Sequence, residues 1–107
     1  MANTFKRSGV KLTATTATNV YTVPASTTSI VKSLYVSNID AAASATIDVY
    51  VTYSSTDYYI IKGATVPVST TLQVITESLV LQASDILKVK ASAANRLDCY
   101  ATYLEIT

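Results

Sequence analysis

Apolar and polar residues alternate along most of this chain, and the clearest alternating run extends from Ala45 to Tyr53. Side chains at every second position of a strand point to the same face, so one face of this run would be apolar and the other largely polar. This pattern is typical of an antiparallel strand with one buried and one solvated face. A polar connector at residues 54–57 predicts a hairpin in which residues 58–62 return as the partner strand.

Shorter runs of the same character recur along the chain at intervals of about ten residues. They cover residues 19–23, 29–37, 71–76, 78–82, 86–92 and 96–106, with Glu77 separating the third run from the fourth. About eight short strands at this spacing are typical of a sandwich or barrel. The chain is therefore predicted to be all-β, a single antiparallel β-sandwich, jelly-roll-like, that occupies residues 1–107 as one domain.

Three local features of these runs can be predicted. In residues 29–37, Ile30, Leu34 and Val36 are expected on the core face, and Lys32 interrupts that face near the sheet rim. Gly63 marks a turn at residues 62–64. Because the chain has only two glycines, its other turns are expected to place Asn, Asp and Ser at positive φ.

The N-terminal segment, residues 1–8, allows two interpretations. It is either an extended arm that clamps a neighbouring subunit or simply the first strand of the sandwich. No apolar stretch in the chain has the length of a secretion signal or a membrane-spanning helix. A membrane is therefore not an expected partner.

The residue types that carry most enzyme chemistry are scarce. The chain has no His and one Cys, so the usual general base and the usual clusters of metal ligands are absent from the sequence. Asp40, Asp57 and Asp85 fall at predicted turns, while Asp48 and Asp98 fall on predicted solvated faces. We predict no catalytic residues, no cofactor, no metal and no small-molecule substrate.

Glu77 and Cys99 are the remaining candidates for chemistry. Glu77 interrupts an apolar stretch and is expected to be an exposed strand-break residue rather than an acid catalyst. Cys99 lies in an alternating run, which predicts a small buried hydrophobe, and a neighbouring Asp98 would disfavour a reactive thiolate.

The charge balance also limits the partners. Charged residues make up 14% of the chain, and the net charge is +1 with Lys and Arg scattered singly. Nucleic-acid-binding domains usually carry a basic stripe, so nucleic acid is not an expected partner. A surface with so little charge favours association with other protein copies.

Tyrosine is the abundant aromatic residue, with eight copies. Tyr50, Tyr58 and Tyr59 lie within ten residues of one another, and adjacent strand residues such as Tyr58 and Tyr59 face opposite sides. The tyrosines are either cross-strand pairs that stabilise the sheet or an exposed face that docks on protein or glycan. The candidate interface residues are Tyr50, Tyr58 and Tyr59, together with Phe5 in the N-terminal segment.

Several segments, taken together, carry a resemblance that spans nearly the whole chain. They are residues 1–6, 20–28, 36–38, 66–68, 79–85, 87–89 and 103–107. On these segments the chain resembles a family of small virion structural proteins of tailed bacteriophages. Ser84-Asp85 stands where Gly-Asp is expected in such proteins, which affects one turn. The family pattern offers no catalytic residue.

The resemblance implies a non-enzymatic role in the virion, after assembly in the host cytoplasm. Capsid decoration or cementing through contacts with the major capsid protein or other virion proteins is the first expectation, with a homotrimer as the expected oligomer. A neck, tail or baseplate accessory protein is the alternative on the particle. A receptor- or glycan-binding β-module is a further alternative, motivated by the tyrosines and the Ser/Thr-rich loops.

Overall fold

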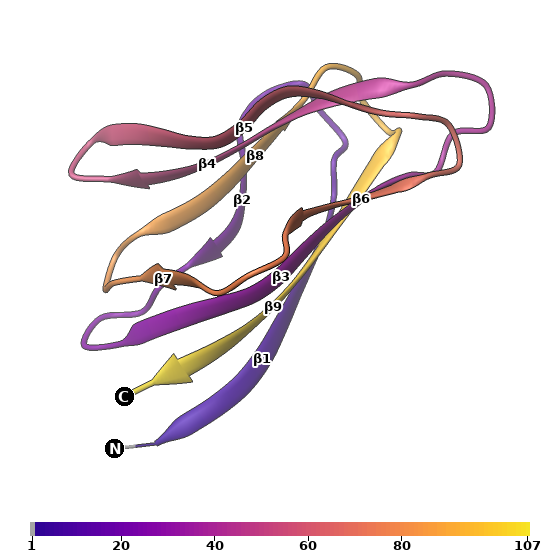
Figure 1. The fold of residues 1–107 in the computed structure, drawn as a ribbon. Helices are drawn as coiled ribbons and strands as arrows, with labels where there is room; N and C mark the ends of the chain where they lie inside the picture. The colour runs from indigo at the N-terminus through magenta and orange to yellow at the C-terminus, as the bar shows by residue number, and fades with distance from the viewer. Residues whose placement is uncertain (1) are drawn as a thin grey trace.

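A computed structural model describes residues 2–107, and every regular element in that range is a β-strand (Figure 1). Nine strands follow one another: β1 (Asn3–Lys11), β2 (Thr18–Thr22), β3 (Thr28–Asn38), β4 (Ala45–Tyr53), β5 (Thr56–Val66), β6 (Thr71–Ile75), β7 (Leu79–Leu81), β8 (Ile86–Ala91) and β9 (Leu97–Ile106). Within the described range no helix is long and apolar enough to cross a membrane.

The strands form two antiparallel sheets. Sheet A has the order β1-β9-β3-β6, with β7 also paired to β3, and sheet B has the order β2-β8-β4-β5. β6 and β7 occupy one strand position beside β3, because the chain leaves the sheet between them at Glu77. With these two strands counted as one position, the order is that of an eight-stranded jelly roll. The predicted all-β antiparallel sandwich is confirmed, and so is the break at Glu77.

The core lies between the inner faces of the two sheets. Leu34 of β3, Ile47 of β4 and Leu87 of β8 are fully buried, and they come from both sheets. The alternation expected for β4 and β8 is confirmed except at two tyrosines, because Tyr53 on the predicted apolar face is exposed and Tyr50 on the other face is buried. Cys99 on β9 is buried in the same core, as its pattern predicted.

The prediction for Ile30 is wrong, and a β-bulge is the reason. The pairing of β3 with β9 shifts register between Val31 and Ser33, so Lys32 is an extra residue without a partner. A bulge of this kind changes which face the following residues occupy. Val31 and Leu34 therefore both face the core, whereas Ile30 lies on the outer face of sheet A. Lys32 is exposed, but it lies in the middle of β3, an inner strand of sheet A, and not near the sheet rim as predicted.

The turn predicted at residues 62–64 is also wrong. These residues lie inside β5, where the pairing with β4 shifts register opposite Asp48. Gly63 has a φ of 68°, a conformation that side-chain-bearing residues rarely adopt. Its backbone N–H donates to the Asp48 carboxylate at 2.7 Å. Glycine therefore serves a bulge here, and the strand continues through it.

The turns confirm the expectation of positive φ for serine and asparagine, whereas no aspartate in the described range has it. Six non-glycine residues in the described range have positive φ: Ser26, Ser54, Ser55, Ser69, Ser84 and Asn95. Ser54 and Ser55 are adjacent and form the tight connection between β4 and β5, as in a hairpin turn with two left-handed residues.

The N-terminal segment was expected to be either an extended arm or the first strand of the sandwich, and in the structure it is the first strand. Residues 3–11 form β1, which pairs with β9 in continuous register from Asn3 opposite Ile106 to Lys11 opposite Asp98. β1 is an edge strand of sheet A, and its residues remain largely exposed. Met1 lies outside the described residues.

Candidate functional site

The four candidate interface residues do not form one surface. Phe5 lies on β1 at one edge of sheet A and is 75% exposed. The three tyrosines lie on the β4–β5 hairpin of sheet B, at the edge formed by β5. Tyr58 and Tyr59 are both about half exposed, whereas Tyr50 is 5% exposed and offers little contact area.

The hairpin tyrosines form two cross-strand pairs on opposite faces of sheet B. The Tyr50 and Tyr59 ring centroids are 4.8 Å apart, and those of Tyr53 and Tyr58 are 4.6 Å apart. Lys62 places its Nζ atom 4.5 Å from the Tyr59 ring centroid, within the range of a cation–π contact. Burial raises the pKa of Tyr50. The pairs therefore stabilise the hairpin and still leave half of Tyr58 and Tyr59 available for contact.

An apolar row crosses the outer face of sheet A and was not recognised from the sequence. Phe5 pairs with Leu104, Leu104 pairs with Ile30, and Ile30 pairs with Val80, so one side chain from each of four strands stands in line. Phe5 and Val80, at the two ends, are the most exposed large hydrophobic residues, at 75% and 60%. We call this set the apolar row. Nothing in the separate strand patterns could reveal it, because the row depends on strand order and register.

Beside the Phe5 end of the apolar row lies a shallow basic depression. Phe5, Arg7 and Lys32 line it together with Lys6, Tyr100 and Thr102. Lys6 is paired with Glu105, whereas Arg7 and Lys32 are exposed and have no ion pair with any described residue. We call Phe5, Arg7 and Lys32 the basic surface.

At the edge of sheet A opposite β1, two adjoining depressions follow β5, β6 and β7. They share Ile60 and Leu79 and form a groove with an apolar floor. Tyr53, Tyr58 and Val80 also line it, and Glu77 and Asp85 supply its charge, with no Lys or Arg among the described lining residues. We call this feature the acidic groove.

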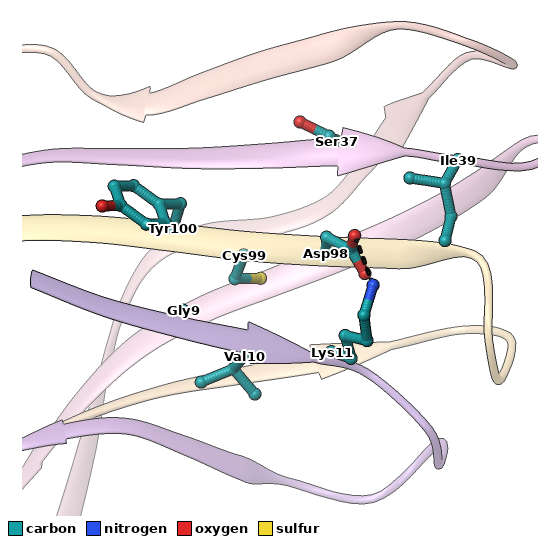
Figure 2. A pocket seen from close by; sticks show the side chains of 8 residues that line it. All are labelled: Gly9, Val10, Lys11, Ser37, Ile39, Asp98, Cys99 and Tyr100. Atoms are coloured by element: carbon teal, nitrogen blue, oxygen red, sulfur yellow. Dashed lines mark hydrogen bonds and ion pairs between the residues drawn. The ribbon is translucent and has the colours of Figure 1, made fainter.

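Figure 2 shows a further depression on the outer face of sheet A, at the other end from the apolar row. Tyr100 lies close to Gly9, where an added Cβ atom would meet the Tyr100 ring at 3.4 Å. Lys11 and Asp98 form an ion pair of 3.0 Å at the far side. Cys99 is 2% exposed although it is among the lining residues, so its thiol is not available at this surface.

The thiol of Cys99 is expected to be unreactive in the folded protein. Burial, and secondarily the neighbouring Asp98 charge, raise the pKa of its thiol to about 12, so very little thiolate exists at neutral pH. A thiol reagent such as Ellman's reagent at pH 8 should label no cysteine in the native protein and one cysteine per chain in guanidinium chloride. Rapid stoichiometric labelling without denaturant would contradict the burial of Cys99.

Glu105 is the buried carboxylate that sequence reasoning missed. It is 6% exposed on the inner face of β9, where the Tyr21 hydroxyl donates to Oε2 at 2.6 Å and Lys6 Nζ lies 2.8 Å from Oε1. The hydrogen bond from Lys6, followed by that from Tyr21, lowers the pKa of Glu105. Tyr103 stacks on Tyr21 with a centroid distance of 3.8 Å. Strict alternation from Leu97 along the last strand would have placed Glu105 inward.

The other acidic residues make local structural contacts or lie exposed. Asp40 pairs with Arg96 at 3.4 Å, and Asp57 accepts a hydrogen bond from Thr52 at 2.7 Å. Asp85 accepts the backbone N–H of Gln82 at 2.9 Å within the β7–β8 turn. Glu77 is exposed on the β6–β7 connection. Among residues 2–107, no group of three or more Cys, Asp or Glu side chains is arranged to hold a metal ion.

Comparisons with known proteins find a similar fold but assign the chain to no family. No protein-family model matches the chain, and no curated protein gives a significant match. A chain from Bacillus endospore appendages, described as a family of disulfide-linked pili, is similar in structure with a TM-score of 0.52. The two are 16% identical, and the match covers 100% of this chain and 91% of the appendage chain. At this identity the likeness shows a shared fold.

A chain of infectious bursal disease virus, Gt strain, also aligns, with a TM-score of 0.45 and 11% identity. That alignment covers 99% of this chain and 31% of the viral chain.

Proposed function

We propose that this chain is a non-enzymatic structural protein that acts through protein–protein contacts in a repetitive assembly. The observation that carries the proposal is the apolar row, which exposes Phe5 and Val80 on a sandwich whose core is otherwise complete. An apolar strip that is partly buried in its middle and exposed at both ends offers apolar area of the kind found at interaction surfaces. The described residues gather no set of groups with the geometry of acid–base or nucleophilic catalysis.

The particular assembly that we propose is the virion of a tailed bacteriophage. The support is the resemblance of residues 20–28, 79–85 and 103–107 to the small virion proteins of such phages. Decoration or cementing of the capsid, through the major capsid protein or another virion protein, is the role that suits a rigid, low-charge sandwich present in many copies. Many weak contacts give strong attachment when copies are linked in one lattice.

The shared fold with the appendage protein is compatible with a structural role, but its disulfide linkage does not transfer to this chain. The single cysteine, Cys99, is buried in the core and cannot reach a neighbouring subunit in the folded state. Non-covalent contacts would therefore hold an assembly of this protein together.

Composition of purified phage particles tests the proposal. We expect quantitative mass spectrometry of gradient-purified particles to find the chain at a copy number set by the capsid lattice, and antibody labelling to place it on the head. A copy number that follows tail symmetry would support the neck, tail or baseplate alternative instead. Absence of the chain from purified particles would overturn a role in the virion.

The Tyr53–Tyr58 pair favours one second candidate, a receptor- or glycan-binding module. Two stacked and half-exposed rings beside Asp85 offer an apolar platform and a hydrogen-bond acceptor, which are features of sugar-binding surfaces. A glycan array in which Tyr58→Ala removes a binding signal given by the native protein would support this function. An array without any signal would exclude it.

A further inference from the structure

We propose that the acidic groove of one copy binds the basic surface of a second copy, so that the protein associates with itself head to tail. This inference deepens the proposed structural role and rests on it, since it names a second copy of the chain as the first partner. It is carried by charge and apolar area at the two edges of sheet A, where β1 bears Phe5 and Arg7 and the groove follows β6 and β7, with Lys32 on β3 between them.

The two surfaces have opposite and uncompensated charge. The basic surface carries Arg7 and Lys32, which have no acidic partner among residues 2–107, and no Asp or Glu lines its depression. The acidic groove carries Glu77 and Asp85 with no Lys or Arg among its described lining residues. Complementary potentials of this kind steer association and fix the orientation of the partners.

The apolar groups on the two surfaces also match. Phe5 projects from the basic surface and is the most exposed large hydrophobic side chain described. The acidic groove offers Ile60, Leu79 and Val80 as apolar area on which such a ring could pack. Exposed aromatic residues next to arginine are typical anchors of protein interfaces.

The topology places the two surfaces so that a copy can bind a neighbour on each side. β1, which carries Phe5 and Arg7, is one edge of sheet A, and β6 and β7 are at the opposite edge. β5 contacts β6 at that opposite edge (Figure 1), and residues of β5, β6 and β7 line the groove. The apolar row runs from Phe5 at one edge to Val80 at the other, and a head-to-tail neighbour would continue it.

Charge argues against the symmetric alternative, in which two copies pair through the same face. The outer face of sheet A carries Arg7, Lys32 and the Lys11–Asp98 pair, so a two-fold contact centred on it would oppose like charges. A head-to-tail contact instead pairs unlike surfaces. Such contacts form a ring where the rotation between copies closes and a filament where it does not.

Sedimentation velocity over a concentration series tests the contact with three versions of the full chain. The first is native, the second is Phe5→Ser/Arg7→Glu, and the third is Glu77→Lys/Val80→Lys. We expect mass to rise with concentration for the native chain and either double variant alone to remain monomeric, with an apparent dissociation constant raised about tenfold or more. Val68→Ser/Lys90→Glu is the matched control, since it makes similar changes at exposed positions outside both surfaces.

A mixture of the two double variants gives the decisive result. Each variant keeps the surface that the other has lost, so an equimolar mixture should form at least a one-to-one dimer, which neither variant forms with itself. High salt should weaken this dimer, since exposed charges contribute to the contact. Circular dichroism and urea unfolding of each variant confirm that the sandwich remains folded.

Two outcomes would overturn the inference. A native chain that stays monomeric at every concentration has no such contact, and double variants that assemble like the native chain do so through other surfaces. Neither result affects the proposed virion role, because detection of the chain in purified particles is an independent measurement. Conversely, a head-to-tail dimer from the mixed variants stands even if the chain is absent from virions.

Discussion

Leu34→Ala should destabilise the protein by about 3 kcal/mol, whereas Ile30→Ala should cost about 1 kcal/mol or less. Leu34 is fully buried between the sheets, so its truncation loses apolar burial and leaves a cavity. Ile30 lies on the outer face of sheet A, where solvent can fill the space that its side chain leaves. The difference arises from the bulge at Lys32, because unbroken alternation would place both residues on one face.

Urea-induced unfolding followed by circular dichroism measures both changes on the same scale, and the chain has no Trp whose fluorescence could serve instead. The two variants form a matched pair on one strand. Similar losses of unfolding free energy for Leu34→Ala and Ile30→Ala would show that β3 alternates without a bulge and would contradict the register described above.

Glu105→Gln should lower the free energy of unfolding at pH 7 by about 2 kcal/mol, as expected for hydrogen bonds to a charged group. The carboxylate is buried and accepts hydrogen bonds from Lys6 and Tyr21, and the amide removes its charge. The hydrogen bonds from Lys6 and Tyr21 hold the pKa of Glu105 below its ordinary value of 4.5. A lowered folded-state pKa contributes stability above the unfolded value, and that contribution disappears as pH falls through the folded pKa.

The native protein and Glu105→Gln should therefore differ most near neutral pH and converge in acid. Urea unfolding at pH 7 and at pH 3 measures the difference in unfolding free energy between the two proteins at each pH. Tyr21→Phe is the control, because it removes one hydrogen-bond donor and leaves the carboxylate in place. The native protein should also lose stability at alkaline pH. The hydrogen bond between Lys6 and Glu105 raises the pKa of Lys6 above 10.5, so the stability that this bond contributes disappears as Lys6 loses its proton. A difference of equal size at pH 3 and pH 7 would contradict a charged Glu105.

Individual strands show how much of the fold the alternation of apolar and polar residues predicts by itself. The period-two pattern predicted β4, β8 and β9 almost to the residue, because each has one face in the core and the burial of that face dominates its sequence. It was less successful in β3 and β5, where bulges add a residue that the pattern cannot distinguish from a strand interruption or a turn.

Some candidate site residues could be proposed from the sequence, and others depend on the tertiary structure. The sequence analysis proposed Tyr58 and Tyr59 because adjacent strand residues face opposite sides, and it proposed Phe5 as part of the N-terminal segment; all three side chains are exposed. Tyr50 is 5% exposed, because the pairing of β4 with β5 places Tyr59 against its ring. The sequence analysis missed Glu105, whose neighbours Lys6 and Tyr21 are more than eighty positions away in the chain.

By itself, the sequence determined the fold class, the placement of serine and asparagine in the turns, and the burial of Cys99. These properties follow from local alternation and from the conformations open to each residue type. Only the tertiary structure decided the strand order, the apolar row, and the separation of the basic surface from the acidic groove. Each of these depends on which distant strands pair and in what register, and neighbouring residues along the chain do not encode that choice.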